Sequence, residues 1–359
     1  MQEIKELLRH FGKQFPFAEP VDYIKLLYQN EFGCGHLCSQ GQEALSLLWE
    51  EWSGMGVNSD IPLFDSIGNG LCRLNLGALG RNDLPLAAQI FALSAQTLRG
   101  DEATFRKKLS LFMEIALNGE LPADGGSICE TVERYLAQGI RPVHHSESYR
   151  KRYAPHYRVV EMRYAVFFPA FQAAQRLLEV GKKPIFAIEG RCASGKTTLA
   201  AMLKQIFHCN VLHMDDFFLP FPMRTQTRLS TPGGNVHYER FLSDVLLPLQ
   251  TGKAFSYRPF CCRDESFGSP VQIVPKPLTV VEGAYSMHPA LRKYYGDSVF
   301  LTISPKIQQS RILARNGAEM LRVFNERWIP MEEHYFRELK IPVSCGTCID
   351  TGVQEMIFV

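Results

Sequence analysis

Residues Glu189 to Thr198 carry the clearest chemistry in the chain, because they fit the phosphate-binding pattern G-x-x-x-x-G-K-[ST]. In such a loop the glycines allow close backbone approach, and the inward N–H groups and the following helix N-terminus hold a polyphosphate. Lys196 is expected to reach the β and γ phosphates, and the Thr197 hydroxyl to ligate Mg²⁺. The residues expected to contact ATP are Gly190, Ala193, Ser194, Gly195, Lys196, Thr197 and Thr198.

The segments on both sides of this loop have the patterns that the mechanism needs. Residues 184–188 form a short apolar run typical of a buried strand, and the apolar residues of 199–207 follow helical spacing. A chance match in a glycine-bearing turn is the alternative, and the two flanking elements argue against it. The loop is therefore predicted to connect a strand to a helix in an α/β domain with a mainly parallel sheet.

Acidic residues follow two further predicted strands. Asp215 and Asp216 come directly after the short strand 211–214, and Glu282 ends the apolar strand 278–281. Ligands bind at the carboxyl edge of α/β sheets, so one aspartate is a candidate acceptor for the proton of an attacking hydroxyl. Aspartate is equally common at helix N-caps and in turns, and position alone does not separate these roles. Glu282 has the usual position of an acid on the Mg²⁺ side.

Arg311 and Arg315 follow a predicted strand at 298–303 and stand at positions i and i+4 of a helix, on one face. Two arginines in this place can close over phosphates and offset charge in a transition state. A solvated helix face is the alternative, and the spacing alone favours it.

These pieces together resemble the uridine kinase branch of the P-loop kinases, whose relatives include phosphoribulokinase and bacterial pantothenate kinase. The resemblance rests on the phosphate loop, Met214–Phe218, Val281–Gly283 and the arginine pair, and it covers about 184–350. It implies that Asp215 is the general base, that Glu282 lies on the Mg²⁺ side, and that the two arginines belong to a lid. Asp216 stands where nucleoside kinases tend to have a small polar residue. The candidate metal ligands are Thr197, Glu282 and Asp216.

The sequence departs from that family where the phosphoryl acceptor is recognised. Gly233–His237 lies in the region where uridine kinases carry nucleoside-binding residues, and Tyr257–Pro259 stands where Tyr-Asp-Phe is expected. Trp328–Phe336 resembles a segment of uncharacterised uridine kinase-like bacterial proteins and has no established role. The family also lacks the long N-terminal half. The candidate substrate residues are Asp215, His237, Tyr257 and Arg258.

Residues 1–155 are predicted to form an all-α domain of unknown role, followed by the P-loop kinase domain at 156–359. The segment 157–180 is expected to be a helical connection interrupted or kinked at Pro169, and a helix of the kinase domain is expected to stop at Pro248. Apolar spacing and glycine stop signals indicate helices in the N-terminal half at 84–99, 103–118 and 128–138.

Three stretches of the N-terminal half look less like scaffold, namely Glu31–His36, Ile67–Arg73 and His144–Tyr153. Each either lines a site or forms a turn or a solvated face. His36, His144 and His145 are candidates for a metal cluster, although their spacing is not diagnostic. The half is expected either to select the acceptor, with His36, Arg73 or His145 contributing, or to form a homodimer.

The chain has 359 residues, of which 46% are hydrophobic and 21% are charged, and a net charge of +2. This composition is typical of a globular protein and does not favour nucleic acid or membrane partners. No apolar run reaches membrane-spanning length, and the start is a charged amphipathic helix rather than a signal peptide. The ten cysteines are scattered, which favours a reducing compartment and a cytoplasmic location, with a redox or zinc role for Cys345-x-x-Cys348 as the minor alternative.

The sequence thus predicts a kinase that uses ATP and Mg²⁺ to phosphorylate a hydroxyl of a nucleoside or a similar small molecule. The alternative is an ATP-dependent switch whose helical half binds a protein or RNA. The absence of an Asn-Lys-x-Asp motif argues against a GTPase. The acid after the second strand and the paired arginines favour transfer over switching.

Overall fold

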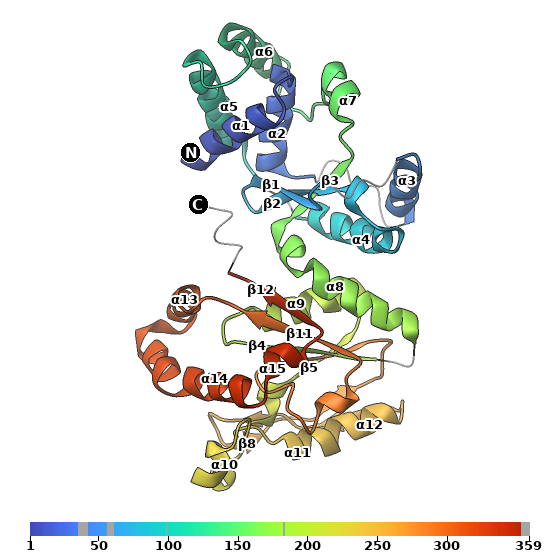
Figure 1. The fold of residues 1–359 in the computed structure, drawn as a ribbon, viewed down its shortest axis with the longest axis vertical. Helices are drawn as coiled ribbons and strands as arrows, with labels where there is room; N and C mark the ends of the chain where they lie inside the picture. The colour runs from blue at the N-terminus through green and yellow to red at the C-terminus, as the bar shows by residue number, and fades with distance from the viewer. Residues whose placement is uncertain (35–41, 56–60, 98, 182–183, 353–359) are drawn as a thin grey trace. The chain divides into compact units, whose positions relative to one another are not determined.

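The computed structural model describes residues 1–34, 42–55, 61–97, 99–181 and 184–352. The chain falls into two compact units, Met1–Ala165 and Val166–Val353, whose elements are shown in Figure 1. The division lies within α8 (Met162–Val180), a helix that contains Pro169. His36, a candidate metal ligand, lies outside the described residues.

The second unit is built around a five-stranded sheet in which every strand is parallel to its neighbours. From edge to edge the strands are β12 (Thr347–Asp350), β11 (Asp297–Thr302), β4 (Ile185–Gly190), β10 (Thr279–Glu282) and β5 (Asn210–His213). The strands β4 and β10 are buried along their whole length, as expected for parallel strands covered on both faces. The predicted α/β fold is confirmed, and the phosphate loop starts from the central strand.

Helices close the core of this unit. α9 (Lys196–Phe207) packs against β4, β5 and β10 with Leu199, Leu203 and Ile206 buried. Two short antiparallel pairs join β6 (Phe255–Tyr257) to β9 (Val271–Ile273) and β7 (Phe260–Cys261) to β8 (Ser266–Phe267). The other described α-helices and π turns are α10 (Gln226–Ser230), α11 (Tyr238–Phe241), the π turn η6 (Leu242–Leu246), α12 (Leu247–Gln250), α13 (Pro305–Val323), the π turn η8 (Phe324–Trp328), α14 (Ile329–Glu338) and α15 (Ile341–Ser344).

Two helices of this unit continue through a proline directly after a π turn. The chain passes from α11 through η6 into α12, which contains Pro248. The expectation that Pro248 stops this helix is therefore wrong. A π turn shifts the backbone hydrogen bonds from i→i+4 to i→i+5, so the N–H that proline lacks does not break a regular ladder there. Pro330 follows η8 in α14 in the same way.

The first unit is mainly helical, as expected, and α4, α5 and α6 correspond to the three helices predicted in its second half. It also contains an antiparallel sheet in which β2 (Leu71–Asn75) lies between β1 (Phe64–Gly68) and β3 (Tyr157–Glu161). Its helices are α1 (Gln2–Gln14), α2 (Pro20–Phe32), α3 (Gln42–Ser53), α4 (Leu84–Ala95), α5 (Glu102–Leu117), α6 (Gly125–Ala137) and α7 (Glu147–Tyr153).

This sheet corrects the expectation of an all-α half and of a helix over 157–161. The strands β1 and β2 form a hairpin across Gly68, Asn69 and Gly70, whose φ angles of 75°, 54° and 71° are those that tight hairpin turns demand. The stretch 67–73 is thus a turn and a strand. Neither β1 nor β3 alternates between buried and exposed residues, so the alternating pattern of a half-buried strand is missing there.

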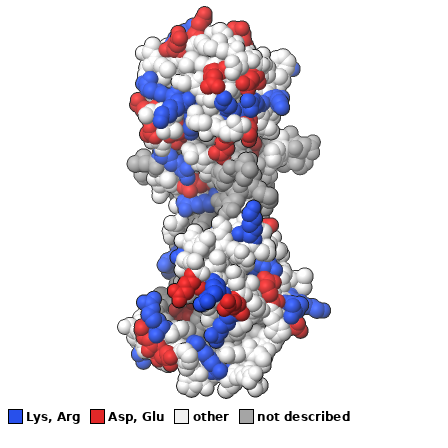
Figure 2. Space-filling model, turned by 90° about the vertical axis from the view of Figure 1, so that its left-hand side faces the viewer, with Lys and Arg blue, Asp and Glu red and all other residues white. Residues whose placement is uncertain are grey.

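Acidic and basic side chains are interspersed over both units on the face shown in Figure 2. This face therefore carries no large area of a single sign, in keeping with the small net charge. Within the described ranges, no helix has both the length and the apolar composition that crossing a membrane requires.

Candidate active site

The phosphate loop connects β4 to α9 and lies against β11. Gly190 has a φ of 147°, and a Cβ atom there would lie 2.3 Å from the carbonyl oxygen of Leu301. The Arg191 N–H donates to the same oxygen at 3.1 Å. Ala193 and Gly195 also have positive φ angles, of 60° and 96°. The loop therefore needs glycine at position 190 both for its conformation and for its packing on β11.

Lys196 is folded back onto this loop. Its Nζ donates to the carbonyl oxygens of Gly190 at 2.7 Å and Arg191 at 3.0 Å, which holds the ammonium group beside the loop. Thr198 follows in the first turn of α9. The Ser194 hydroxyl is buried and has no hydrogen-bond partner among the described residues. A pre-placed cation and an unpaired buried hydroxyl are both satisfied by an anionic ligand.

Three side chains meet at the carboxyl ends of β10 and β5. Glu282 Oε1 lies 2.5 Å from His213 Nδ1, and both Glu282 carboxylate oxygens lie 3.4 Å from Thr197 Oγ1. Sheet register produces the first contact, because Glu282 and His213 are paired residues. The hydrogen bond to Glu282 raises the pKa of His213. A carboxylate beside a hydroxyl is the kind of oxygen pair that Mg²⁺ takes from a protein when phosphates complete its shell.

Asp215 lies just beyond β5, in the short helix η4 (Met214–Phe217). A Cβ atom built on Gly283 would lie 3.6 Å from Asp215 Oδ1, so this carboxylate faces the chain directly after Glu282. Burial and the Glu282 charge raise the pKa of Asp215, while Lys196 acts in the opposite direction. These three charged side chains therefore belong to one site. A raised pKa matches an aspartate better to accepting a proton near neutral pH.

Asp216 has a different set of partners. The Tyr257 hydroxyl donates to Asp216 Oδ2 at 2.8 Å, and Arg240 donates to the Asp216 carbonyl oxygen at 2.7 Å. Burial and Asp216 raise the pKa of Tyr257, so its hydroxyl keeps the proton that it donates. The three expected metal ligands therefore do not share one set of contacts. Asp216 is hydrogen-bonded to Tyr257, whereas Glu282 lies beside Thr197.

The two remaining acceptor candidates are engaged elsewhere. His237 caps α11, where its Nδ1 accepts from the Arg240 N–H at 3.2 Å. Arg258 donates to the carbonyl oxygens of residues 267–268, both at 2.9 Å, and so braces the β7–β8 hairpin. Among the described residues, neither side chain hydrogen-bonds to Asp215.

Of the expected lid arginines, Arg311 reaches the phosphate loop. It donates to the carbonyl oxygens of Ala193 at 3.3 Å and of Thr351 at 3.0 Å. Arg315 is exposed and donates to its neighbour Asn316 at 2.7 Å. The i,i+4 spacing therefore does not place both side chains on the loop in this structure.

Two acids of α14 hold the loop from outside, and their role was not expected from the sequence. Glu332 Oε2 accepts from the Cys192 N–H at 2.9 Å, and burial raises the pKa of Glu332. Glu333 forms a bidentate pair with Arg191, with N–O distances of 2.7 and 3.1 Å. The only sequence signal for these contacts was the segment Trp328–Phe336, to which no role could be attached.

Glu189 is fully buried directly before the loop and was also missed. Its Oε1 accepts from the Gly190 N–H at 2.9 Å, and its Oε2 accepts from the Met287 N–H and the Tyr335 hydroxyl, both at 3.1 Å. Burial raises the pKa of Glu189 to about 7, because these donors do not replace all the hydration that the carboxylate loses. The loop pattern does not mark this position.

The described histidine and cysteine candidates lie in different surroundings. His145 lies 2.7 Å from Asp22 Oδ1 and 2.7 Å from the Tyr157 hydroxyl, and His144 is exposed. The thiols of Cys345 and Cys348 are free. In the part of the chain that the structure describes, no group of three or more His, Cys, Asp or Glu side chains is arranged to hold a metal ion.

No family model matches the chain, and no curated protein matches it. Among solved structures, one described as a possible uridine kinase from Bacillus stearothermophilus is 17% identical with a TM-score of 0.38, over 51% of this chain and 100% of that one. D-glycerate 3-kinase from Cryptococcus neoformans var. grubii serotype A is 13% identical with a TM-score of 0.35, over 47% of this chain and 88% of that one. These likenesses concern the fold, and the roles of the site residues rest on the geometry above.

Proposed function

We propose that the protein is an ATP-dependent phosphotransferase that transfers the γ-phosphoryl group to a hydroxyl of a small molecule, such as a nucleoside. The observation that supports this most is the meeting of Asp215, Lys196, Thr197 and Glu282 at the carboxyl edge of the sheet. Phosphoryl transfer needs a held donor, oxygen ligands for a divalent ion, and a base for the acceptor. This group of side chains has the chemistry for all three.

The loop and its neighbours fit Mg·ATP. The backbone beside Gly190 leaves no room for a side chain, Ser194 has a buried hydroxyl without a described partner, and Lys196 supplies a cation. Thr197 and Glu282 would hold the metal ion through a hydroxyl and a carboxylate oxygen. When bound, Mg·ATP supplies the phosphoryl group and part of the charge neutralisation.

In the proposed reaction, Asp215 takes the proton of the acceptor hydroxyl while the acceptor oxygen bonds to the γ-phosphorus and the bond to the ADP oxygen breaks. Its raised pKa makes Asp215 a stronger base than an exposed aspartate. Lys196 exchanges the carbonyl oxygens of Gly190 and Arg191 for the transferring group, and Arg311 adds a second positive charge from its place on the loop. Most of the rate enhancement then comes from positioning and charge neutralisation.

ADP release with Mg·ATP across a panel of nucleosides, sugars, polyols and pantothenate tests this function, with Lys196→Ala as the blank. We expect Asp215→Asn to keep its nucleotide affinity and to lower turnover about 10²–10⁴-fold, the usual contribution of a general base. Asp216→Asn is the matched control, because it changes a neighbouring carboxylate that is bonded to Tyr257. Wild-type turnover in Asp215→Asn would remove Asp215 from the base role.

The same panel separates the proposal from an ATP-dependent switch. A kinase gives a signal that depends on Lys196 with one class of acceptor. A protein that binds ATP through Lys196, hydrolyses it slowly and responds to no acceptor would favour the switch.

A further inference from the structure

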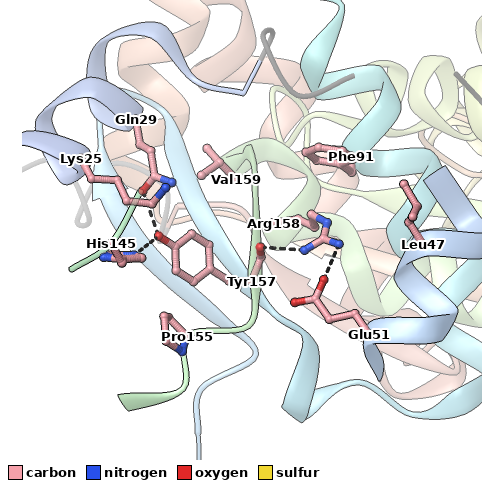
Figure 3. Close-up of a pocket in the computed structure, with 10 residues that line it drawn as sticks. All are labelled: Lys25, Gln29, Leu47, Glu51, Phe91, His145, Pro155, Tyr157, Arg158 and Val159. Carbon is pink, nitrogen blue, oxygen red and sulfur yellow. Dashed lines mark hydrogen bonds and ion pairs between the residues drawn. The ribbon is translucent and has the colours of Figure 1, made fainter. Parts of the chain in front are cut away.

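The first unit contains a cavity of about 290 Å³ at the outer edge of its sheet (Figure 3). Most of its lining comes from α2, α3, α4 and β3, and all of it belongs to the first unit. None of the lining residues belongs to the phosphate loop. Its volume is just below the range of about 300–1,000 Å³ for ligand sites, which suits a small metabolite.

Positive charge at one end of the cavity is not neutralised by an ion pair within the described residues. Lys25 is half-buried, and among the residues that the structure describes its Nζ donates only to the Val143 carbonyl oxygen, at 3.0 Å. Arg73 is 3% exposed and lies 4.4 Å from the ring of Tyr157; it donates to Gln29 Oε1 at 3.0 Å, and its Nε has no described partner. Burial, together with the charge of Arg73, lowers the pKa of Lys25 to about 8. The charge of Asp22 acts in the opposite direction.

Two acidic groups, Asp22 and Asp65, interact with these cations. Asp22 is bonded to His145 Nδ1 and accepts from the Ser146 N–H and hydroxyl. Burial alone would raise its pKa, but these bonds hold the pKa of Asp22 below the ordinary value, so the carboxylate keeps a negative charge that offsets part of the positive charge here. Asp65 is paired with Arg73 in the sheet register; burial raises the pKa of Asp65, while the charge of Arg73 acts in the opposite direction.

The edge strand β3 adds a backbone donor. In an antiparallel pair, every second residue of β3 forms backbone hydrogen bonds to β2. The register shows that Arg158 and Val160 are such residues. Val159 therefore turns its N–H away from β2; it lines the cavity, and its N–H has no hydrogen-bond partner among the described residues. The guanidinium of Arg158 also lines the cavity but is paired with Glu51 at 2.6 Å.

The walls opposite these donors combine two apolar side chains with the Arg158–Glu51 pair (Figure 3). Phe91 of α4 is buried and Leu47 of α3 is 50% exposed, and Figure 3 shows both on the side of β3 away from Lys25. The exposed leucine and the aromatic ring present apolar surface that an organic ligand can remove from water when it binds. An ammonium group and an unpaired N–H offer it two donors, which an oxyanion satisfies.

We propose that this cavity binds a small organic anion, with its oxyanion at Lys25 and the Val159 N–H and its apolar body against Leu47 and Phe91. A phosphate monoester and a carboxylate share this chemistry, so both are included in the test. The site would give the first unit a ligand of its own, independent of the nucleotide.

Tryptophan fluorescence of the full-length chain carrying Trp328→Phe tests the proposal. The chain has three tryptophans, and the other two, Trp49 and Trp52, lie on α3 close in sequence to Leu47. The probes are benzoate, phenyl phosphate, acetate, inorganic phosphate and neutral benzyl alcohol. We expect a saturable change with benzoate or phenyl phosphate and weaker binding of acetate and inorganic phosphate, which lack the apolar body. The tighter of the first two probes identifies the head group.

Variants in the same background locate the binding site. Lys25→Met should weaken binding at least about tenfold, as expected for the loss of a charge-assisted hydrogen bond. Leu47→Ser should weaken the binding of benzoate and leave the binding of acetate unchanged. Lys151→Met removes an exposed lysine of α7, and Lys196→Ala removes the cation of the phosphate loop; neither should change binding.

Four results would overturn the proposal. They are no saturable change with any probe up to about 10 mM, equal affinity for benzoate and benzyl alcohol, loss of binding in Lys196→Ala, and wild-type affinity in Lys25→Met. If Lys25→Met does not fold, as judged by circular dichroism, Leu47→Ser decides instead, because its side chain is half exposed and an unchanged benzoate affinity would place the probe elsewhere.

Discussion

Replacing Glu189 by glutamine should change how the stability of the second unit depends on pH. The carboxylate is fully buried, and burial raises its pKa to about 7 from an ordinary 4.5. The folded state therefore holds a proton on Glu189 more tightly than the unfolded chain does. The stability that this proton contributes is fully present below pH 4.5 and is lost as the pH rises through about 7.

The gap between the two pKa values corresponds to about 3 kcal/mol, at roughly 1.4 kcal/mol per pKa unit. Between about pH 4.5 and pH 8 the wild type should lose that much unfolding free energy relative to Glu189→Gln, which has no proton to release. Glutamine also offers one acceptor fewer to the three donors, but this fixed penalty cancels when only the pH dependence is compared. Asp215 and Glu332, whose pKa values are also raised, are present in both proteins.

Urea unfolding at several pH values from about 5 to 8 measures this difference. The substitutions Trp49→Phe and Trp52→Phe leave Trp328 as the sole tryptophan, so the fluorescence reports on the second unit. The advantage of the glutamine variant should grow steadily with pH. A difference between the two proteins that stays constant within about 1 kcal/mol would refute the reasoning, because Glu189 would then be ionised throughout the range.

Two further substitutions test the packing of the phosphate loop. Gly190→Ala should lower the stability of the second unit by more than about 3 kcal/mol in urea unfolding, because the new Cβ would lie 2.3 Å from the Leu301 carbonyl oxygen. Glu332→Ala should weaken ATP binding about tenfold in calorimetric titration, because the Cys192 N–H of the loop loses its acceptor.

Each of these has a matched control in the same unit. Gly181 has a φ of 77°, and a Cβ atom added there would meet no atom of the described residues within 4 Å, so Gly181→Ala isolates the cost of positive φ, about 1 kcal/mol. Glu326→Ala removes an exposed acid of η8. If Gly190→Ala cost no more than Gly181→Ala, or if Glu332→Ala bound ATP as tightly as Glu326→Ala, the loop would not need these contacts.

The centre of the second unit could be predicted from the sequence because its signals are local. A short apolar run, the loop pattern and helical spacing after it fall within 184–207, and together they determine β4, the loop and α9. The acids at 215 and 282 could be placed for a related reason: parallel strands end at the same edge of a sheet, whatever separates them in the sequence.

The rest depends on contacts between distant segments. Glu332 and Cys192 are hydrogen-bonded although 140 residues separate them in the sequence. The residues around either position do not predict this contact. The sheet of the first unit is completed by β3, which is far from β2 in the sequence and has no strand pattern of its own. Arg315 shows that a local pattern also has a limit. Its position on the helix was predicted correctly, but the helical spacing did not determine which partner its side chain takes. Pro248 was misjudged because a π turn has no sequence signature.

The central place of β4 also has a consequence for a chain that is still being synthesised. Both neighbours of β4 come later: β10 begins at Thr279 and β11 at Asp297. At roughly 5–20 residues per second, the ribosome needs several seconds or more to deliver the first of them. The first unit has all its strands once Glu161 has emerged. A nascent chain of about 250 residues thus contains the complete sheet of the first unit, while the apolar strand β4 has no neighbour at either edge. This is the stage at which the chain most needs protection from aggregation.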